Sequence, residues 1–126
     1  GTRENEEAIQ GCPAIAEVAV VGVADHLKGQ MPMAFAVVKS AASIASPELR
    51  ATLEKEVMKQ VDHSLGAIAR PSRVHFLTVL PKTRSGKLLR RSIQALAEGR
   101  DPGDLTTIED PAALEQLQMA LGFTTS

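Results

Sequence analysis

Residues 17–39 read EVAVVGVADHLKGQMPMAFAVVK and contain the clearest strand signal in the chain. Two runs rich in valine, residues 17–24 and 31–39, stand on either side of a turn-like segment that contains Gly29. Branched and aromatic side chains favour strands, and a short connection with glycine joins antiparallel neighbours. The segment therefore predicts an antiparallel pair of strands, which needs cover from other elements to be stable.

The flanking sequence predicts that cover. Ser46 and Asp110 are each followed by proline, which is the pattern of a helix cap with proline in the first turn. The periodicity of apolar residues predicts helices over residues 47–65, 87–98 and 111–121. A cap at Thr2 and a stop at Gly11 and Pro13 predict a short helix over residues 2–10, and the run RVHFLTVL between two prolines predicts a third strand over residues 73–80. We therefore expect an α+β fold, with a small, mainly antiparallel sheet of about three strands flanked by helices.

The composition limits the class of protein. With 126 residues, 44% of them hydrophobic and 23% charged, the chain fits one globular domain and neither a disordered nor a fibrous protein. A formal net charge of -1 argues against a nucleic-acid binder held by bulk charge. The single cysteine, Cys12, cannot form an internal disulfide, and no apolar run approaches the roughly 20 residues of a spanning helix. The expected compartment is the cytoplasm.

Charge is segregated along the second half of the chain. Residues 81–91 carry five cations and no acid, whereas residues 101–126 carry five acids and no Lys or Arg. Within the basic segment, Gly86 allows close approach and Lys87 offers a mobile ammonium, so the loop suits a phosphate or a carboxylate. A nucleotide-binding P-loop is excluded, because that motif needs glycine where Pro81 stands and Ser or Thr where Leu88 stands. A solvated basic surface remains the simpler interpretation of such a run.

The sequence PKTRSGK at residues 81–87, followed by LLRRSIQALAEG and DLTTIEDPAAL, resembles the C-terminal domain of the acyl-CoA synthetases of the acetate and propionate group. These enzymes belong to the adenylate-forming superfamily. GTRENEEAI resembles the start of that domain, and residues 17–39 resemble its first hairpin. The segment LAEGRDPGDLTTIEDPAAL is more similar to propionate–CoA ligases than to acetate ligases. The resemblance implies that residues 1–126 form one mobile C-terminal domain of a larger synthetase whose large N-terminal domain is absent.

The resemblance also implies an acid–thiol ligase that forms AMP. Such an enzyme adenylates propionate or acetate with ATP and transfers the acyl group to coenzyme A, and the chain alone is expected to be inactive. Mg²⁺ is expected in the full-length enzyme without a ligand from this domain. Lys87 matches the lysine that supports adenylation, and the other residues expected in the substrate and ATP loop are Pro81, Thr83, Arg84, Ser85 and Gly86.

Regulation follows from the same resemblance. Lys87 is expected to be a modification site, with a protein acetyltransferase and a sirtuin-type deacylase as partners beside the N-terminal adenylation domain. Neither a nucleic acid nor a membrane is an expected partner.

Two residues depart from the resembled pattern. Asn5 stands where an aliphatic residue is usual on the first helix, which predicts looser packing or an altered register there. Asp62 stands where acetate enzymes often carry an arginine for coenzyme A, so that contact must come from elsewhere. The three histidines, His26, His63 and His75, show no metal-ligand spacing, and no metal site is predicted. The alternative function is a non-catalytic interaction module whose basic loop binds an acidic partner.

Overall fold

The middle strand of the structure is β2 (Gly29–Val38), which pairs with a different strand on each side. β1 (Ile15–Asp25) runs antiparallel to it and β3 (Val74–Leu77) runs parallel, in the order β1-β2-β3. The computed structural model describes residues 2–25, 27 and 29–122. The predicted α+β fold with a small, mainly antiparallel sheet is confirmed.

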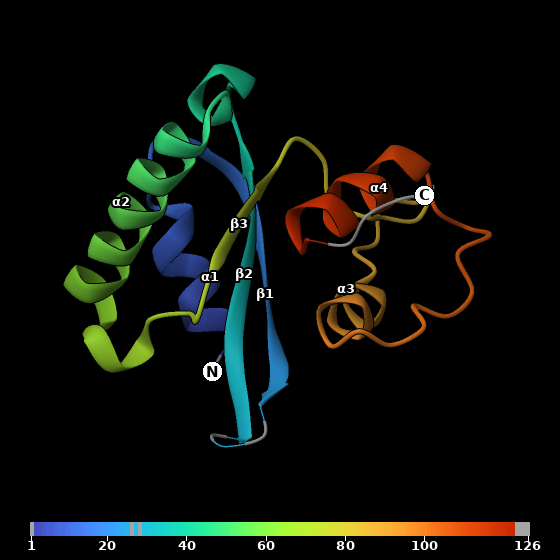
Figure 1. Ribbon diagram of the computed structural model, residues 1–126, viewed down its shortest axis with the longest axis horizontal. Coiled ribbons are helices and arrows are strands. Elements are labelled where there is room, and N and C mark those ends of the chain that lie inside the picture. The colour runs from blue at the N-terminus through green and yellow to red at the C-terminus, as the bar shows by residue number, and fades with distance from the viewer. Residues whose placement is uncertain (1, 26, 28, 123–126) are drawn as a thin grey trace.

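Helices cover both faces of this sheet (Figure 1). α1 (Thr2–Gln10) and α2 (Pro47–Leu65) lie on one face, and α3 (Arg90–Ala97) and α4 (Pro111–Ala120) lie on the other. Two short 3₁₀ helices, η1 (Ala41–Ile44) and η2 (Ala67–Ala69), stand at the two ends of α2. None of the helices in the described part of the chain is both long and apolar enough to span a bilayer.

The alternation of side chains along β2 creates two hydrophobic cores. Ala34, Ala36 and Val38 face α1 and α2, whereas Phe35 and Val37 face α3 and α4. The first core also contains Ile9, Cys12, Val20, Leu53, Val57, Val61 and Phe76, and the second contains Ala19, Val21, Leu77, Ile93, Leu96 and Leu117. Each helix pair therefore has its own apolar surface on the sheet.

The predicted helix caps are present. Ser46 Oγ accepts a hydrogen bond from the Leu49 N–H at 3.1 Å, and Pro47 is the first residue of α2. Asp110 Oδ1 accepts from the Ala112 N–H at 3.0 Å, and Pro111 is the first residue of α4. Both helices begin where the sequence predicted, because a polar cap and a proline satisfy the first turn locally.

Two predicted elements are longer than the observed ones. The third strand ends at Leu77 because the next N–H, that of Thr78, donates to Gln116 Oε1 at 2.8 Å and the chain leaves the sheet. The helix predicted from residue 87 begins at Arg90. Residues 87–89 instead pair with residues 81–83, which places Lys87 on a hairpin.

Asn5 is buried, with 6% of its surface exposed, on the face of α1 where an aliphatic residue was expected. Its side-chain amide donates to the carbonyl of Ala69 in η2, which offsets the cost of burying a polar group. The same face buries Ala8 and Ile9. The predicted loosening is not what the structure shows, since the amide ties α1 to the turn after α2.

Truncation of Leu117 tests whether α4 belongs to the second core. Leu117 is completely buried, so Leu117→Ala is expected to lower the free energy of unfolding by about 2–5 kcal/mol. Met119 on the same helix is 69% exposed, and Met119→Ala is expected to change the free energy of unfolding by less than about 0.5 kcal/mol. Urea denaturation of the 126-residue chain measures both, and equal effects would show that α4 does not pack as described.

Candidate functional site

The basic segment forms a small hairpin, residues 81–89, between β3 and α3. Its arms are joined at one end by the Leu89 N–H, which donates to the Pro81 carbonyl at 3.0 Å. At the other end the Thr83 N–H donates to the Lys87 carbonyl and the Gly86 N–H donates to the Thr83 carbonyl, both at 2.8 Å. Pro81 is among the fully buried side chains, whereas residues 84–87 are exposed. The hairpin therefore has a buried base and an exposed tip.

The tip depends on the backbone conformation of Gly86. Its φ of 89° lies in the left-handed region, where residues with a Cβ pay a steric penalty. Apart from Gly86 and its two chain neighbours, no described atom lies within 4 Å of a Cβ placed there, so space does not require glycine. The turn of the hairpin is thus closed by a glycine in the left-handed conformation, and Lys87 follows that glycine directly.

A segment near the C-terminus supports one arm of the hairpin. The Arg84 N–H donates to the Thr107 carbonyl at 3.1 Å, and the Glu109 N–H donates to the Lys82 carbonyl at 2.8 Å. The arm is therefore the middle one of three short antiparallel segments. The acidic tail and the basic loop, separate along the sequence, meet here through backbone groups.

The cations of the hairpin region differ in their partners. Lys82 Nζ donates to Glu17 Oε2 at 2.8 Å, and Arg90 donates to both oxygens of Glu6 at 2.8 and 2.9 Å. Among the described residues, no ion pair is found for Lys87 or Arg91, and both are exposed. The structure thus leaves the ammonium at the tip available to an external anion.

Glu6 lies at the centre of this charge arrangement. Burial would raise the pKa of its carboxyl, but hydrogen bonds from Arg90 and from the Val20 N–H outweigh burial and hold the pKa below its usual value. The carboxylate therefore stays charged at neutral pH and ties α1, β1 and α3 together. Neither Glu6 nor Glu17 was predicted as part of the site, because each lies far from the hairpin in sequence.

The structure brings the predicted site residues Pro81, Thr83, Arg84, Ser85, Gly86 and Lys87 together in one hairpin. Arg84 Nη1 lies 3.4 Å from the Thr106 carbonyl, so its side chain turns toward the supporting segment. Thr83 Oγ1 lies 2.9 Å from Ser85 Oγ. The side chains of Thr83 and Ser85 thus bond within the hairpin and that of Arg84 bonds to the supporting segment.

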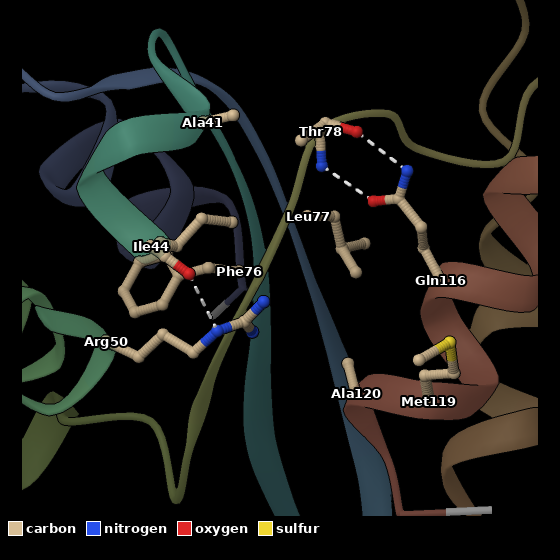
Figure 2. A pocket seen from close by; sticks show the side chains of 9 residues that line it. All are labelled: Ala41, Ile44, Arg50, Phe76, Leu77, Thr78, Gln116, Met119 and Ala120. Carbon is tan, nitrogen blue, oxygen red and sulfur yellow. Dashed lines mark hydrogen bonds between the residues drawn. The ribbon is translucent and has the colours of Figure 1, made fainter. Parts of the chain in front are cut away.

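A surface cavity of about 430 Å³ lies between the start of α2 and α4 (Figure 2). Its lining is largely apolar, and at its rim Gln116 and Thr78 exchange hydrogen bonds of 2.7 and 2.8 Å. Arg50, at the opposite side, donates from Nε to the Ile44 carbonyl at 3.2 Å. The polar groups of this cavity join α4 to the residue that follows β3 and α2 to η1, and none of its lining residues belongs to the hairpin.

Asp62 lies on α2 at a second cavity, of about 390 Å³, whose lining also contains Lys55, Lys59 and Arg73. Its carboxylate accepts from Arg70 at 2.6 Å through Oδ1 and also through Oδ2. This pairing is the main reason why the pKa of Asp62 lies below its usual value. An acid stands where the resemblance predicted an arginine, and the cations around it come from neighbouring positions.

The residues that the structure describes contain no group of three or more His, Cys, Asp or Glu that could hold a metal ion. Cys12 is buried, and burial raises the pKa of its thiol, which suits packing rather than nucleophilic chemistry. The ring of His75 stacks on Phe35 with 5.4 Å between centroids, and burial lowers its pKa. His26 lies outside the described residues.

The molecule is thus an α+β domain whose glycine-closed hairpin presents Lys87, a lysine for which the described part of the chain offers no ion pair. It belongs to the AMP-binding enzyme C-terminal domain family, whose model matches residues 4–87. The resemblance predicted from residues 81–87 and the flanking segments is confirmed.

Relatives support the same assignment. The chain is 54% identical over 121 residues to a propionate–CoA ligase of Escherichia coli, covering 96% of this chain and 19% of that protein. It is 47% identical over 120 residues to an acetyl-coenzyme A synthetase of Pyrobaculum aerophilum, covering 95% and 17%. A Brucella canis acyl-CoA synthetase structure superposes with a TM-score of 0.58 at 35% identity, covering 70% of this chain and 15% of that one. The chain therefore spans less than a fifth of the length of these curated relatives.

Substitution of Gly86 tests the conformation of the hairpin tip. Gly86→Ala forces a Cβ into the left-handed region at a cost of about 1–2 kcal/mol, which corresponds to roughly a 5- to 30-fold change in a local opening equilibrium. We expect the Lys87 amide to exchange hydrogen faster by that factor in NMR measurements of the 126-residue chain. Gly86→Asn should show a smaller effect, because asparagine tolerates this conformation. Unchanged exchange in both variants would contradict the conformation.

Proposed function

We propose that this chain is the mobile C-terminal domain of an AMP-forming short-chain acyl-CoA synthetase. In the first half-reaction a propionate or acetate oxygen attacks the α-phosphorus of ATP, and pyrophosphate leaves. In the second, the thiol of coenzyme A attacks the acyl carbon, and AMP leaves. The support is the unpaired Lys87 on its hairpin, in a chain 54% identical over 96% of its length to a propionate–CoA ligase.

Lys87 supports the first half-reaction in this proposal. A carboxylate and a triphosphate repel each other, and an ammonium between them offsets this repulsion and stabilises the charge that develops on the leaving pyrophosphate. At an effective dielectric constant near 20, two unit charges about 4 Å apart interact by roughly 4 kcal/mol. That energy is equivalent to about three decades of rate.

The neighbouring cations are not equivalent to Lys87. Lys82 is held by Glu17, and Arg90 is held by both oxygens of Glu6. Moving either one toward an external anion would leave a carboxylate without its partner. Lys87 is exposed, has no ion pair among the described residues and follows Gly86 at the tip of the hairpin, which favours it as the residue that enters the active site. Arg91 is also exposed, but it lies on α3, beyond the hairpin.

The remaining parts of the reaction lie outside this chain in our proposal. ATP acts as its Mg²⁺ complex, and the described residues offer no metal-binding group, so we assign the metal ligands to the N-terminal adenylation domain. The acyl pocket belongs to that domain too, and the chain alone is inactive. We propose the cytoplasm as the compartment, because the single cysteine fits a reducing environment.

Lys87→Ala in the full-length enzyme is expected to lower the rate of adenylation by about two to three orders of magnitude, because the ammonium is lost. Formation of the thioester from supplied acyl-adenylate should largely survive. ATP–pyrophosphate exchange measures the first step and acyl-CoA release measures the second. Arg91→Ala removes a nearby exposed cation that has no ion pair with any described residue, so it is the matched control and should leave both rates within about threefold. Equal loss in the two half-reactions of Lys87→Ala would contradict the assigned role.

We also propose that acylation of Lys87 regulates the enzyme, with a protein acetyltransferase and a sirtuin-type deacylase as the opposing partners. Acetylation or propionylation replaces the ammonium by a neutral amide and adds bulk at the exposed tip of the hairpin. Lys82 and Arg90 keep their charges but remain bound to their carboxylates. They therefore cannot substitute for the lost group.

Stoichiometric acylation of Lys87 in the full-length enzyme is expected to abolish adenylation and spare thioester formation. Mass spectrometry locates the modified residue, and both half-reactions are measured before and after enzymatic deacylation, which should restore the first. Full adenylation activity with Lys87 completely acylated would overturn both this switch and the catalytic role.

A further inference from the structure

Thr83 is the residue on which the hydrogen bonds of the hairpin converge. Its N–H donates to the Lys87 carbonyl at 2.8 Å, and its side-chain Oγ1 accepts the Lys87 N–H at 3.0 Å. Both backbone polar groups of Lys87 are therefore bound by Thr83. Because these groups fix the backbone of Lys87, they set the direction in which its side chain leaves the hairpin.

The hydroxyl of Thr83 takes the place of a backbone acceptor for the Lys87 N–H. Gly86 interrupts the regular ladder, since its own N–H closes the turn onto the Thr83 carbonyl at 2.8 Å. The next N–H, that of Lys87, is paired by the Thr83 side chain. Oγ1 also lies 2.9 Å from Ser85 Oγ, which restricts its rotation. Without the hydroxyl, the Lys87 N–H would turn to water on an exposed loop and the tip would sample more conformations.

Thr83 is itself held by residues 107–109. Thr83 and Ile108 form an antiparallel bridge, and the hydrogen bonds on either side of it join Arg84 to Thr107 and Glu109 to Lys82. Ile108 is only 8% exposed, so this segment is anchored in the body of the domain. It also lies beyond residues 4–87, the part matched by the family model. The support for the hairpin therefore comes from a part of the chain outside the matched region.

We propose that Thr83 is a positioning residue for Lys87. Residues 107–109 hold Thr83 in place through backbone hydrogen bonds on the side of its arm opposite Lys87. Thr83 acts through the orientation of Lys87 and not by touching ATP. The inference rests on the proposed adenylation role of Lys87 and deepens it. A misplaced catalytic group costs rate more than affinity, so the effect should fall on kcat of the adenylation step.

The test compares Thr83→Val with Thr83→Ser in the full-length enzyme. Valine keeps the shape of threonine and removes the hydroxyl, whereas serine keeps the hydroxyl. We expect Thr83→Val to lower kcat of ATP–pyrophosphate exchange by about 10- to 100-fold with KM for ATP little changed, and Thr83→Ser to stay within about threefold of wild type. Thioester formation from supplied acyl-adenylate should be unaffected in both variants.

A second pair of variants tests whether residues 107–109 support the arm that contains Thr83. Glu109→Pro removes the N–H that donates to the Lys82 carbonyl, and Glu109→Ala keeps it. We expect Glu109→Pro to lower adenylation kcat as Thr83→Val does, and Glu109→Ala to behave as wild type. Unchanged adenylation in Glu109→Pro would overturn the supporting role of residues 107–109.

Three outcomes would overturn the role of Thr83. A higher KM for ATP at unchanged kcat in Thr83→Val would show direct contact with the nucleotide. An equal loss in both half-reactions would show a merely structural role. Normal adenylation in Thr83→Val, with Lys87→Ala impaired, would refute the positioning role and leave the proposed function intact. Normal adenylation in Lys87→Ala would instead refute the proposed function.

Discussion

The whole domain depends on one strand whose two faces are both buried. Ala34 and Ala36 are small enough for α1 and α2 to pack closely over β2, and Phe35 fills the space beneath α3 and α4 from the opposite face. A one-residue slip of β2 would exchange these two sets of side chains and place the large ring under the wrong pair of helices. The register of this strand is therefore the constraint that assigns each helix to its face.

Elements with local signals were predictable from the sequence. The valine runs of β1 and β2 and the Ser46–Pro47 and Asp110–Pro111 caps contain within a few residues the groups that stabilise them. The start of α3 was predicted three residues too early, since Leu88 and Leu89 continue the apolar period of the helix. Their N–H and C=O groups belong instead to the hairpin, where Leu89 pairs with Pro81. Periodicity does not reveal which partner a backbone group selects.

The candidate site was predictable only at its tip. The local sequence PKTRSGK identifies the loop and its terminal lysine, but the partners that occupy the other cations come from distant positions. Lys82 and Glu17 are 65 residues apart, and Arg90 and Glu6 are 84 residues apart. Such pairs exist only once the sheet has brought β1 and α1 beside the hairpin. Pairing across the fold thus sets Lys82 and Arg90 apart from Lys87, although these basic residues look alike in the sequence.

Because β2 contributes to both cores, the two cores are completed at different times during synthesis on the ribosome. The first core is complete once Phe76 has been made, whereas the second needs Leu117, about 40 residues later. At about 5–20 residues per second, that delay lasts roughly 2 to 8 s. During this interval only α3, once Ile93 and Leu96 have been made, can cover the apolar surface of Phe35, Val37 and Leu77, while the other face of the sheet is already packed. The nascent chain can then associate with other chains or with chaperones through this surface, until α4 covers it.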